Sequence, residues 1–76
     1  MRRGSFRKVE FTIERTHMYG HYEIRATYRG KEIKAITTDA EAYDWIDDDS
    51  NKEKHRDARR HCYYKIVHNY NEIYGY

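Results

Sequence analysis

Residues 50–74, SNKEKHRDARRHCYYKIVHNYNEIY, contain neither Gly nor Pro and predict one long helix. Ser50 and Glu53 have the Ser-x-x-Glu spacing of a capping box, which satisfies free amide donors in the first helical turn. Apolar and aromatic residues recur at helical spacing over roughly half of the circumference: Ala58, Cys62, Tyr63, Ile66, Val67, Tyr70, Ile73 and Tyr74. Because so wide a stripe needs a broad partner, we expect the helix to cover a β-sheet.

Three segments before this helix alternate apolar and polar residues, as half-buried β-strands do. They are residues 6–15, 22–29 and 32–37. Their inward positions hold Val9, Phe11, Ile13, Tyr22, Ile24, Ala26, Tyr28, Ile33 and Ala35. Ile36 falls out of phase, so we expect it to be exposed or to mark a bulge. The pattern predicts three antiparallel strands joined by tight turns.

A short helix is predicted between the strands and the long helix. Thr38 and Glu41 repeat the capping-box spacing, and apolar residues on one side extend the pattern to about Asp48. Three consecutive aspartates, residues 47–49, then end it, because the macrodipole disfavours anions at a helix C-terminus. We therefore predict a two-layer α+β fold of the order βββαα, a single domain over residues 1–76, with residues 1–5 flexible.

The composition indicates a thin, aromatic core. The 76 residues include no Leu, but nine Tyr, two Phe and one Trp, and the formal net charge is +2. A chain of this length buries only about 60% of its unfolded surface, and association with another chain is a common remedy for such small cores. No apolar run is long enough for a membrane span and no signal peptide is evident, so we expect a cytoplasmic protein that does not bind membranes.

Five histidines and several acidic residues are candidate metal ligands. His61 and His68 would lie about 10 Å apart along the helix, which is too far for one ion. His17 and His21 lack an evident third ligand. The Asp47-x-Asp49-x-Asn51 run resembles the start of a calcium loop but lacks the glycine and the final glutamate that such a loop needs. We predict no metal site and no cofactor.

Cys62 is the only cysteine, which excludes an intramolecular disulfide and a cysteine-based zinc site within one chain. It falls at the edge of the apolar stripe and is interpreted as a structural thiol. The sequence contains no Gly-rich phosphate loop and no nucleophile elbow, and a domain this small has little room for a substrate pocket. We predict that the protein is not an enzyme.

The tyrosines of the long helix indicate a protein interface, because Tyr is enriched at interface hot spots. The helix would rise about 35 Å, longer than the sheet beneath it, so its last turns should overhang. The alternative is that Tyr replaces the missing Leu in the core, and we expect Tyr63 and Tyr70 inside and Tyr64, Tyr74 and Tyr76 partly exposed. The candidate interface residues are Tyr64, Tyr70, Tyr74 and Tyr76, of which Tyr70 should be the most buried.

Two basic segments flank an acidic block that extends over residues 39–49. The basic residues are Arg2, Arg3, Arg7 and Lys8 near the N-terminus, and Lys52, Lys54, Arg56, Arg59 and Arg60 early in the long helix. One interpretation is compensation between neighbouring helices, since surface pairs are common and individually weak. The other is that these cations contact the phosphates of DNA.

Residues 20–45 are similar in pattern to the N-terminal arm-binding domains of tyrosine recombinases. The similar elements are Tyr22 in a strand, the Gly30-Lys31 turn, Thr37 or Thr38 before a helix, and Glu41-Ala42 followed by Trp45. The resemblance implies a three-stranded sheet that precedes a helix and reads DNA. It covers about a third of the chain. The chain departs from the pattern in its half-acidic outer sheet face and its long second helix, and we do not assign it to that family.

These observations favour a small non-enzymatic binding module that acts through protein–protein contacts. We expect it to self-associate, as a homodimer, through the tyrosine-rich helix, and to regulate or inhibit a larger complex. The alternative function is DNA binding through the two basic segments.

Overall fold

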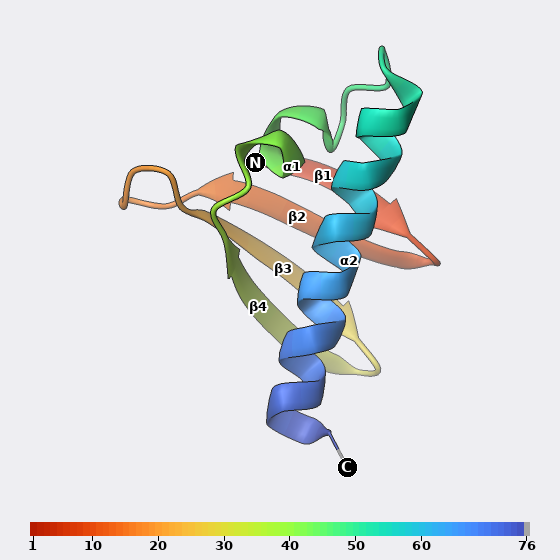
Figure 1. The fold of residues 1–76 in the computed structure, drawn as a ribbon. Helices are drawn as coiled ribbons and strands as arrows, with labels where there is room; N and C mark the ends of the chain where they lie inside the picture. Colours follow the sequence, from red (N-terminus) through yellow and green to blue (C-terminus); the bar gives the residue numbers. More distant parts are fainter. Residues whose placement is uncertain (76) are drawn as a thin grey trace.

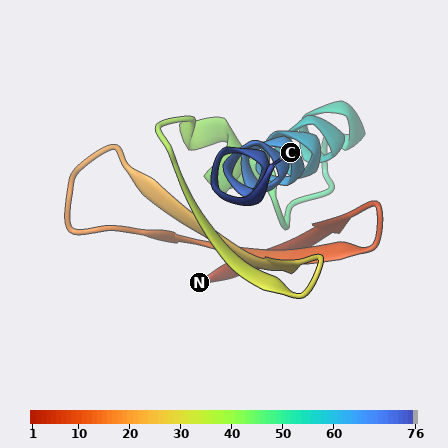
Figure 2. The ribbon, with the colours of Figure 1, turned by 90° about the horizontal axis from the view of Figure 1, so that it is seen from below.

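The computed structural model describes residues 1–75, which form an antiparallel sheet with two helices on one of its faces (Figures 1 and 2). The strands are β1 (Arg2–Phe6), β2 (Val9–Arg15), β3 (Tyr22–Tyr28) and β4 (Lys31–Thr37), paired in the order β1-β2-β3-β4. The helices are α1 (Ala40–Trp45) and α2 (Lys52–Tyr74). The α+β class, the antiparallel sheet and the long C-terminal helix are therefore confirmed.

The sheet has four strands, so the predicted number of three is wrong. The additional strand is β1, within residues that we expected to be flexible, and it pairs with β2 from Arg2↔Ile13 to Phe6↔Val9. Residues 7 and 8, which we placed inside a strand, form the turn between β1 and β2. The strand escaped notice because two of its inward positions hold Arg2 and Gly4, so that no apolar alternation is visible.

The core lies between the sheet and the helices, and isoleucine supplies most of its volume. Five isoleucines, Ile13, Ile24, Ile33, Ile46 and Ile66, are almost fully buried. Their neighbours in the core are Phe11, Ala35, Ala42, Ala58 and Cys62. The other face of the sheet, which we call the open face, carries polar side chains and Ile36, which is 49% exposed. The alternation of apolar and polar residues along the strands thus separates a buried face from a solvent-exposed face.

Each helix begins one residue later than the capping-box spacing predicted. Asn51, not Ser50, caps α2, and its side-chain oxygen accepts a hydrogen bond from the Lys54 amide. Asp39, not Thr38, caps α1 by accepting from the Glu41 amide. Asn and Asp are themselves among the strongest N-caps, and each stands next to the residue that we chose. Helix α1 also ends at Trp45, earlier than predicted.

Helix α2 crosses the helix-bearing face of the sheet from β1 towards β4 (Figure 1). Its first turns lie beside α1, where His55 Nδ1 is 2.9 Å from the Trp45 carbonyl oxygen. Farther along, the Asn69 side-chain amide donates to the backbone carbonyl of Lys34 in β4. All four residues from Asn71 to Tyr74 are exposed, so the end of α2 extends past the sheet. Within residues 1–75, neither helix combines the length and the apolarity that crossing a membrane requires.

We expect Gly4→Ala to destabilise the protein. A Cβ at Gly4 would lie 2.9 Å from Ile46 Cγ1 and 3.1 Å from Phe11 Cε1, and both of these side chains are buried in the core. Such overpacking lowers the free energy of unfolding by about 1–3 kcal/mol, which urea denaturation would measure. Ser5→Ala, on the exposed side of the same strand, is the control and should change it by less than about 0.5 kcal/mol. Equal stability of Gly4→Ala and wild type would contradict the packing of β1 on Ile46.

Candidate functional site

A row of aromatic rings runs along one side of α2. The rings belong to Phe6, Tyr28, Tyr63, Tyr64, Tyr70 and Tyr74, and neighbouring ring centroids lie 5.1–6.3 Å apart. Most of the pairs are tilted or edge-to-face, the arrangements that the quadrupoles of aromatic rings favour. Because Phe6 and Tyr28 come from β1 and β3, this aromatic row joins the helix to the ends of two strands.

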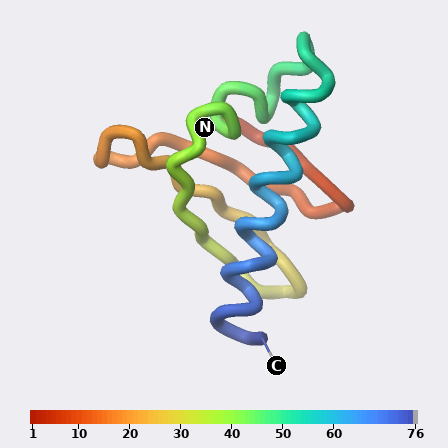
Figure 3. The backbone as a smooth tube through the Cα atoms, in the orientation of Figure 1, coloured from red at the N-terminus to blue at the C-terminus, as the bar shows by residue number. Residues whose placement is uncertain are grey.

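The turns that follow β1 and β3 emerge on the same side of α2, whereas the turn between β2 and β3 lies on the other side (Figure 3). This follows from the meander order, which places alternate turns at the same end of a sheet. Both turns have two residues, and φ is positive at both positions: 49° at Arg7 and 66° at Lys8, then 51° at Arg29 and 77° at Gly30. Positive φ at both positions is the conformation of a type I′ hairpin turn.

The residues in these turns are unfavourable for the conformation that they adopt. Type I′ turns strongly prefer Asn-Gly, but here one turn is Arg7-Lys8 and the other is Arg29-Gly30. An ordinary residue in the left-handed region costs about 1–2 kcal/mol. Three basic residues are therefore held in a conformation that destabilises the fold. Because backbone strain of this kind concentrates at functional sites, these turns are candidates for part of the functional site.

Four basic side chains at these turns, which we call the tip cations, are Arg7, Lys8, Arg29 and Lys31. Three of them lie over rings of the aromatic row. Arg7 is 5.8 Å from the centroid of Tyr63, Arg29 is 5.7 Å from Tyr70, and Lys31 is 5.3 Å from Tyr74. Within residues 1–75, no ion pair includes a tip cation. The tip cations thus present positive charge beside aromatic surface.

The candidate interface tyrosines differ in exposure. Tyr64 is 48% exposed and Tyr74 is 45% exposed, while Tyr70 is half-buried against Tyr28. Tyr63 is half-buried as well. The tyrosines of α2 thus contribute both to packing and to the exposed surface, so each of the two interpretations, core and interface, describes some of them. Tyr76 lies outside the described residues. Ile73 is the most exposed apolar residue of α2, at 64%.

The nine cations proposed for DNA binding do not share one surface. Arg2 is engaged within the fold, since its guanidinium donates to the Tyr43 carbonyl at 2.8 Å and stacks on the Tyr43 ring. Lys54 lies 3.3 Å from Glu41, and Arg60 lies 3.9 Å from Asp57. The remaining members are Arg3 on the open face, Arg7 and Lys8 at a turn, and Lys52, Arg56 and Arg59 on α2.

The end of α1 and the loop that follows it carry an acidic cluster that we call the acidic turn, residues 44–49. Its carboxylates are Asp44, Asp47, Asp48 and Asp49, all of them exposed. No ion pair among residues 1–75 includes any of the four. Asp48 accepts a hydrogen bond from the Ser50 amide at 2.9 Å, and that bond lowers the pKa of Asp48. The four carboxylates of the acidic turn therefore have no ion-pair partner among residues 1–75.

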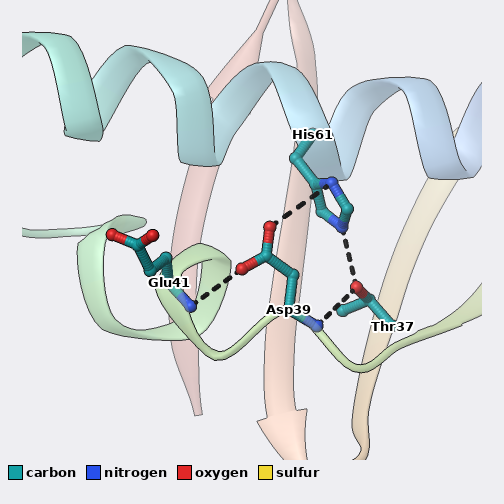
Figure 4. Close-up of polar contacts among 4 residues, drawn as sticks. All are labelled: Thr37, Asp39, Glu41 and His61. Carbon is teal, nitrogen blue, oxygen red and sulfur yellow. Dashed lines mark hydrogen bonds and ion pairs between the residues drawn. The ribbon is translucent and has the colours of Figure 1, made fainter.

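His61 ties α2 to the segment between β4 and α1 (Figure 4). The Thr37 hydroxyl oxygen lies 2.7 Å from His61 Nε2 and accepts from the Asp39 amide at 3.1 Å, so its proton is free to be donated to Nε2. His61 Nδ1 then faces the Asp39 carboxylate at 3.8 Å. Burial lowers the pKa of His61, and Asp39 opposes that effect. The order Thr, His, Asp resembles a catalytic triad, but Thr37 is 3% exposed and cannot meet a substrate.

The other candidate groups are the thiol of Cys62 and the potential metal ligands. Cys62 is fully buried, and burial raises the pKa of its thiol to about 12, so the reactive thiolate is scarce at neutral pH. Within the described part of the chain, no three side chains of His, Cys, Asp or Glu gather closely enough to hold a metal ion.

Comparisons with protein-family models, with curated proteins and with solved structures gave no match.

Two of the four tip cations, Arg29 and Lys31, were absent from both sets of candidate residues. Interpreted singly, each was a turn residue or a strand residue with an ordinary solvent-exposed charge. The strand order indicates that the two basic turns are neighbours. In a meander, the turns after the first and the third strands lie at the same end of the sheet. Recognition of β1 as a strand is needed before this pattern can be seen.

We expect Lys8→Gly to stabilise the protein. Gly tolerates the φ of 66° that Lys8 adopts, so the substitution removes strain and should raise the free energy of unfolding by about 1 kcal/mol in urea denaturation. Glu10→Gly is the matched control, placed in β2 where φ is not positive, and it should lose about 0.5–1 kcal/mol. A loss of stability in Lys8→Gly would show that its conformation is not strained.

We expect stability to fall with acidification because of His61. Its pKa in the folded state lies below the ordinary value of 6.5, so the unfolded chain binds the proton more strongly. The stability that neutral His61 provides is therefore complete above about pH 6.5 and is lost as the pH falls through the folded-state pKa. Urea midpoints at pH 7.5 and 5.0 should differ more for the wild type than for His61→Gln. Equal differences would show that His61 is not the group responsible.

Proposed function

We propose that this chain is a non-enzymatic binding module that acts through protein contacts. Its binding face consists of the tip cations together with the exposed Tyr64, Ile73 and Tyr74. Arg and Tyr are the residue types that dominate interface hot spots, and here they lie in contact with each other. A chain of 76 residues with such a face suits a protein that regulates or inhibits a larger complex by occupying part of its surface.

One observation carries this proposal: the apolar stripe of α2 continues beyond the sheet. Ile66 is the last residue of the stripe that is fully buried, and Tyr70 is half-covered by Tyr28. Ile73 and Tyr74 follow at the same helical spacing but have 64% and 45% of their surfaces exposed. Apolar residues in phase with the core that remain exposed at the end of the helix are what a docking surface would provide.

A protein partner fits this face better than DNA does. Duplex binding depends on a field of clustered cations, and the nine candidate cations are dispersed or engaged within the fold. Stacking of single-stranded bases requires free aromatic faces, but Arg7 and Arg29 lie over the rings of Tyr63 and Tyr70. At a protein interface, the same guanidinium groups can stay over the rings and still donate hydrogen bonds to an acidic side chain of the partner.

We expect the double substitution Ile73→Ser and Tyr74→Ser to weaken protein binding at least tenfold, about 1.4 kcal/mol. Both side chains are exposed, so the fold should be retained. Sedimentation equilibrium would measure self-association, and capture from an extract on the immobilised protein would measure binding of other proteins. Ile36→Ser is the control, because Ile36 is exposed at 49% on the open face.

Two outcomes bear on the proposed function. Loss of a bound protein in the double variant, with retention in Ile36→Ser, would support it. Equal binding by wild type, double variant and control would overturn it, because the binding face would then contribute nothing.

A further inference from the structure

We infer that the partner of the binding face is a second copy of the chain, bound head to tail: the tip cations of one copy contact the acidic turn of the next. This inference rests on the proposed function and names its partner. The chain supplies both halves of the contact. Four exposed cations and four exposed carboxylates lack an ion-pair partner within the described residues.

The acidic turn and two of the tip cations, Arg29 and Lys31, lie at opposite ends of α2. Only Ser50 and Asn51 separate the acidic turn from the first residue of α2, Lys52. Arg29 and Lys31 lie against Tyr70 and Tyr74 near the last residue of the helix. From Lys52 to Tyr70 the helix rises about 27 Å. That distance exceeds twice the Debye length of about 10 Å at 0.1 M salt, so these ends cannot neutralise each other within one copy. Between two copies, nothing prevents their contact.

Aromatic and apolar residues accompany the charges on both sides of this contact. Tyr74 lies under Lys31, with Ile73 exposed beside it, and Trp45 lies within the acidic turn. Trp45 is half-buried, with Lys54 over its ring at 5.3 Å. Surface ion pairs alone contribute little to affinity, so burial of Ile73 and Tyr74 would provide much of the stability while the charges set the orientation.

A head-to-tail contact joins two different surfaces, which distinguishes it from a two-fold symmetric dimer. An open assembly of any size keeps one free acidic end and one free basic end, so assembly continues until a ring closes or a filament forms. The wild type should therefore exceed the mass of a dimer as its concentration rises. Screening of the charges should weaken the contact.

The test uses two variants, each blocked at one end. The base-end variant is Lys8→Gln, Arg29→Gln and Lys31→Gln, and the acid-end variant is Asp44→Asn, Asp47→Asn and Asp49→Asn. Asp48 is kept because its carboxylate accepts from the Ser50 amide. Sedimentation velocity at about 50 mM salt should show each variant alone as a monomer. An equimolar mixture should show a species of twice the monomer mass and nothing larger, since each variant retains the end that the other lacks.

A matched control removes the same number of positive charges from the open face: Arg3→Gln, Arg25→Gln and Lys34→Gln. It should assemble as the wild type does, and wild-type association should weaken at least tenfold between about 50 and 300 mM salt. Circular dichroism would establish that every variant is folded.

Three outcomes would overturn the inference. In the first, the wild type remains a monomer at low salt, and capture of a foreign protein that requires Ile73 and Tyr74 would then keep the proposed function intact. In the second, the acid-end variant still forms dimers, which indicates a symmetric contact. In the third, the wild-type monomer binds single-stranded DNA and the base-end variant does not, which assigns the tip cations to phosphate and overturns the proposed function as well.

Discussion

The close packing of Ala58, Cys62 and Ile66 on the sheet is the interaction on which the rest of the structure depends. These are the three buried residues of α2, and two of them are small, which permits a close approach of the helix to the elements beneath it. The isoleucines of the strands fill the space that Leu occupies in many other proteins. Because the buried stripe is narrow, the larger tyrosines cannot enter the core and instead line its side. The aromatic row is thus a consequence of the close approach of α2.

The charges of the molecule are arranged by the same packing. With α2 fixed across the sheet, the turns after β1 and β3 are carried to one side of the helix, and the α1–α2 loop is carried to its first turn. Acidic residues before α2 and cations near its last turns both complement the helix macrodipole, which favours this polarity. The dipole acts only over the terminal turns, however, and leaves most of the charge on either surface without a partner. The helix dipole therefore favours this placement of the charges but compensates only part of them.

The sequence predicted the elements whose side-chain pattern repeats, and missed those fixed by single contacts. The pattern of β2, β3, β4 and α2 was visible because each has inward residues at regular spacing. Strand β1 was hidden because Gly4 is required by the approach of Ile46, a contact between residues far apart in the chain. The cap positions shifted by one because Asn51 and Asp39 compete with their neighbours for the same amides. Tyr64 and Tyr74 were identified as surface residues from helical spacing, whereas Arg29 and Lys31 could be identified only from the order of the strands.

The hydrogen bond from the Asn69 side chain to the Lys34 carbonyl lies at the free edge of β4, which has a strand neighbour on one side only. A free strand edge is a template on which another chain can add a strand, and repeated addition leads to aggregates. Asn69 occupies one of the acceptors that such an intruding strand would need. Unwinding of the end of α2 would release that carbonyl and leave the edge of β4 without this protection. Helix α2 therefore protects the sheet from misassembly as well as covering its core.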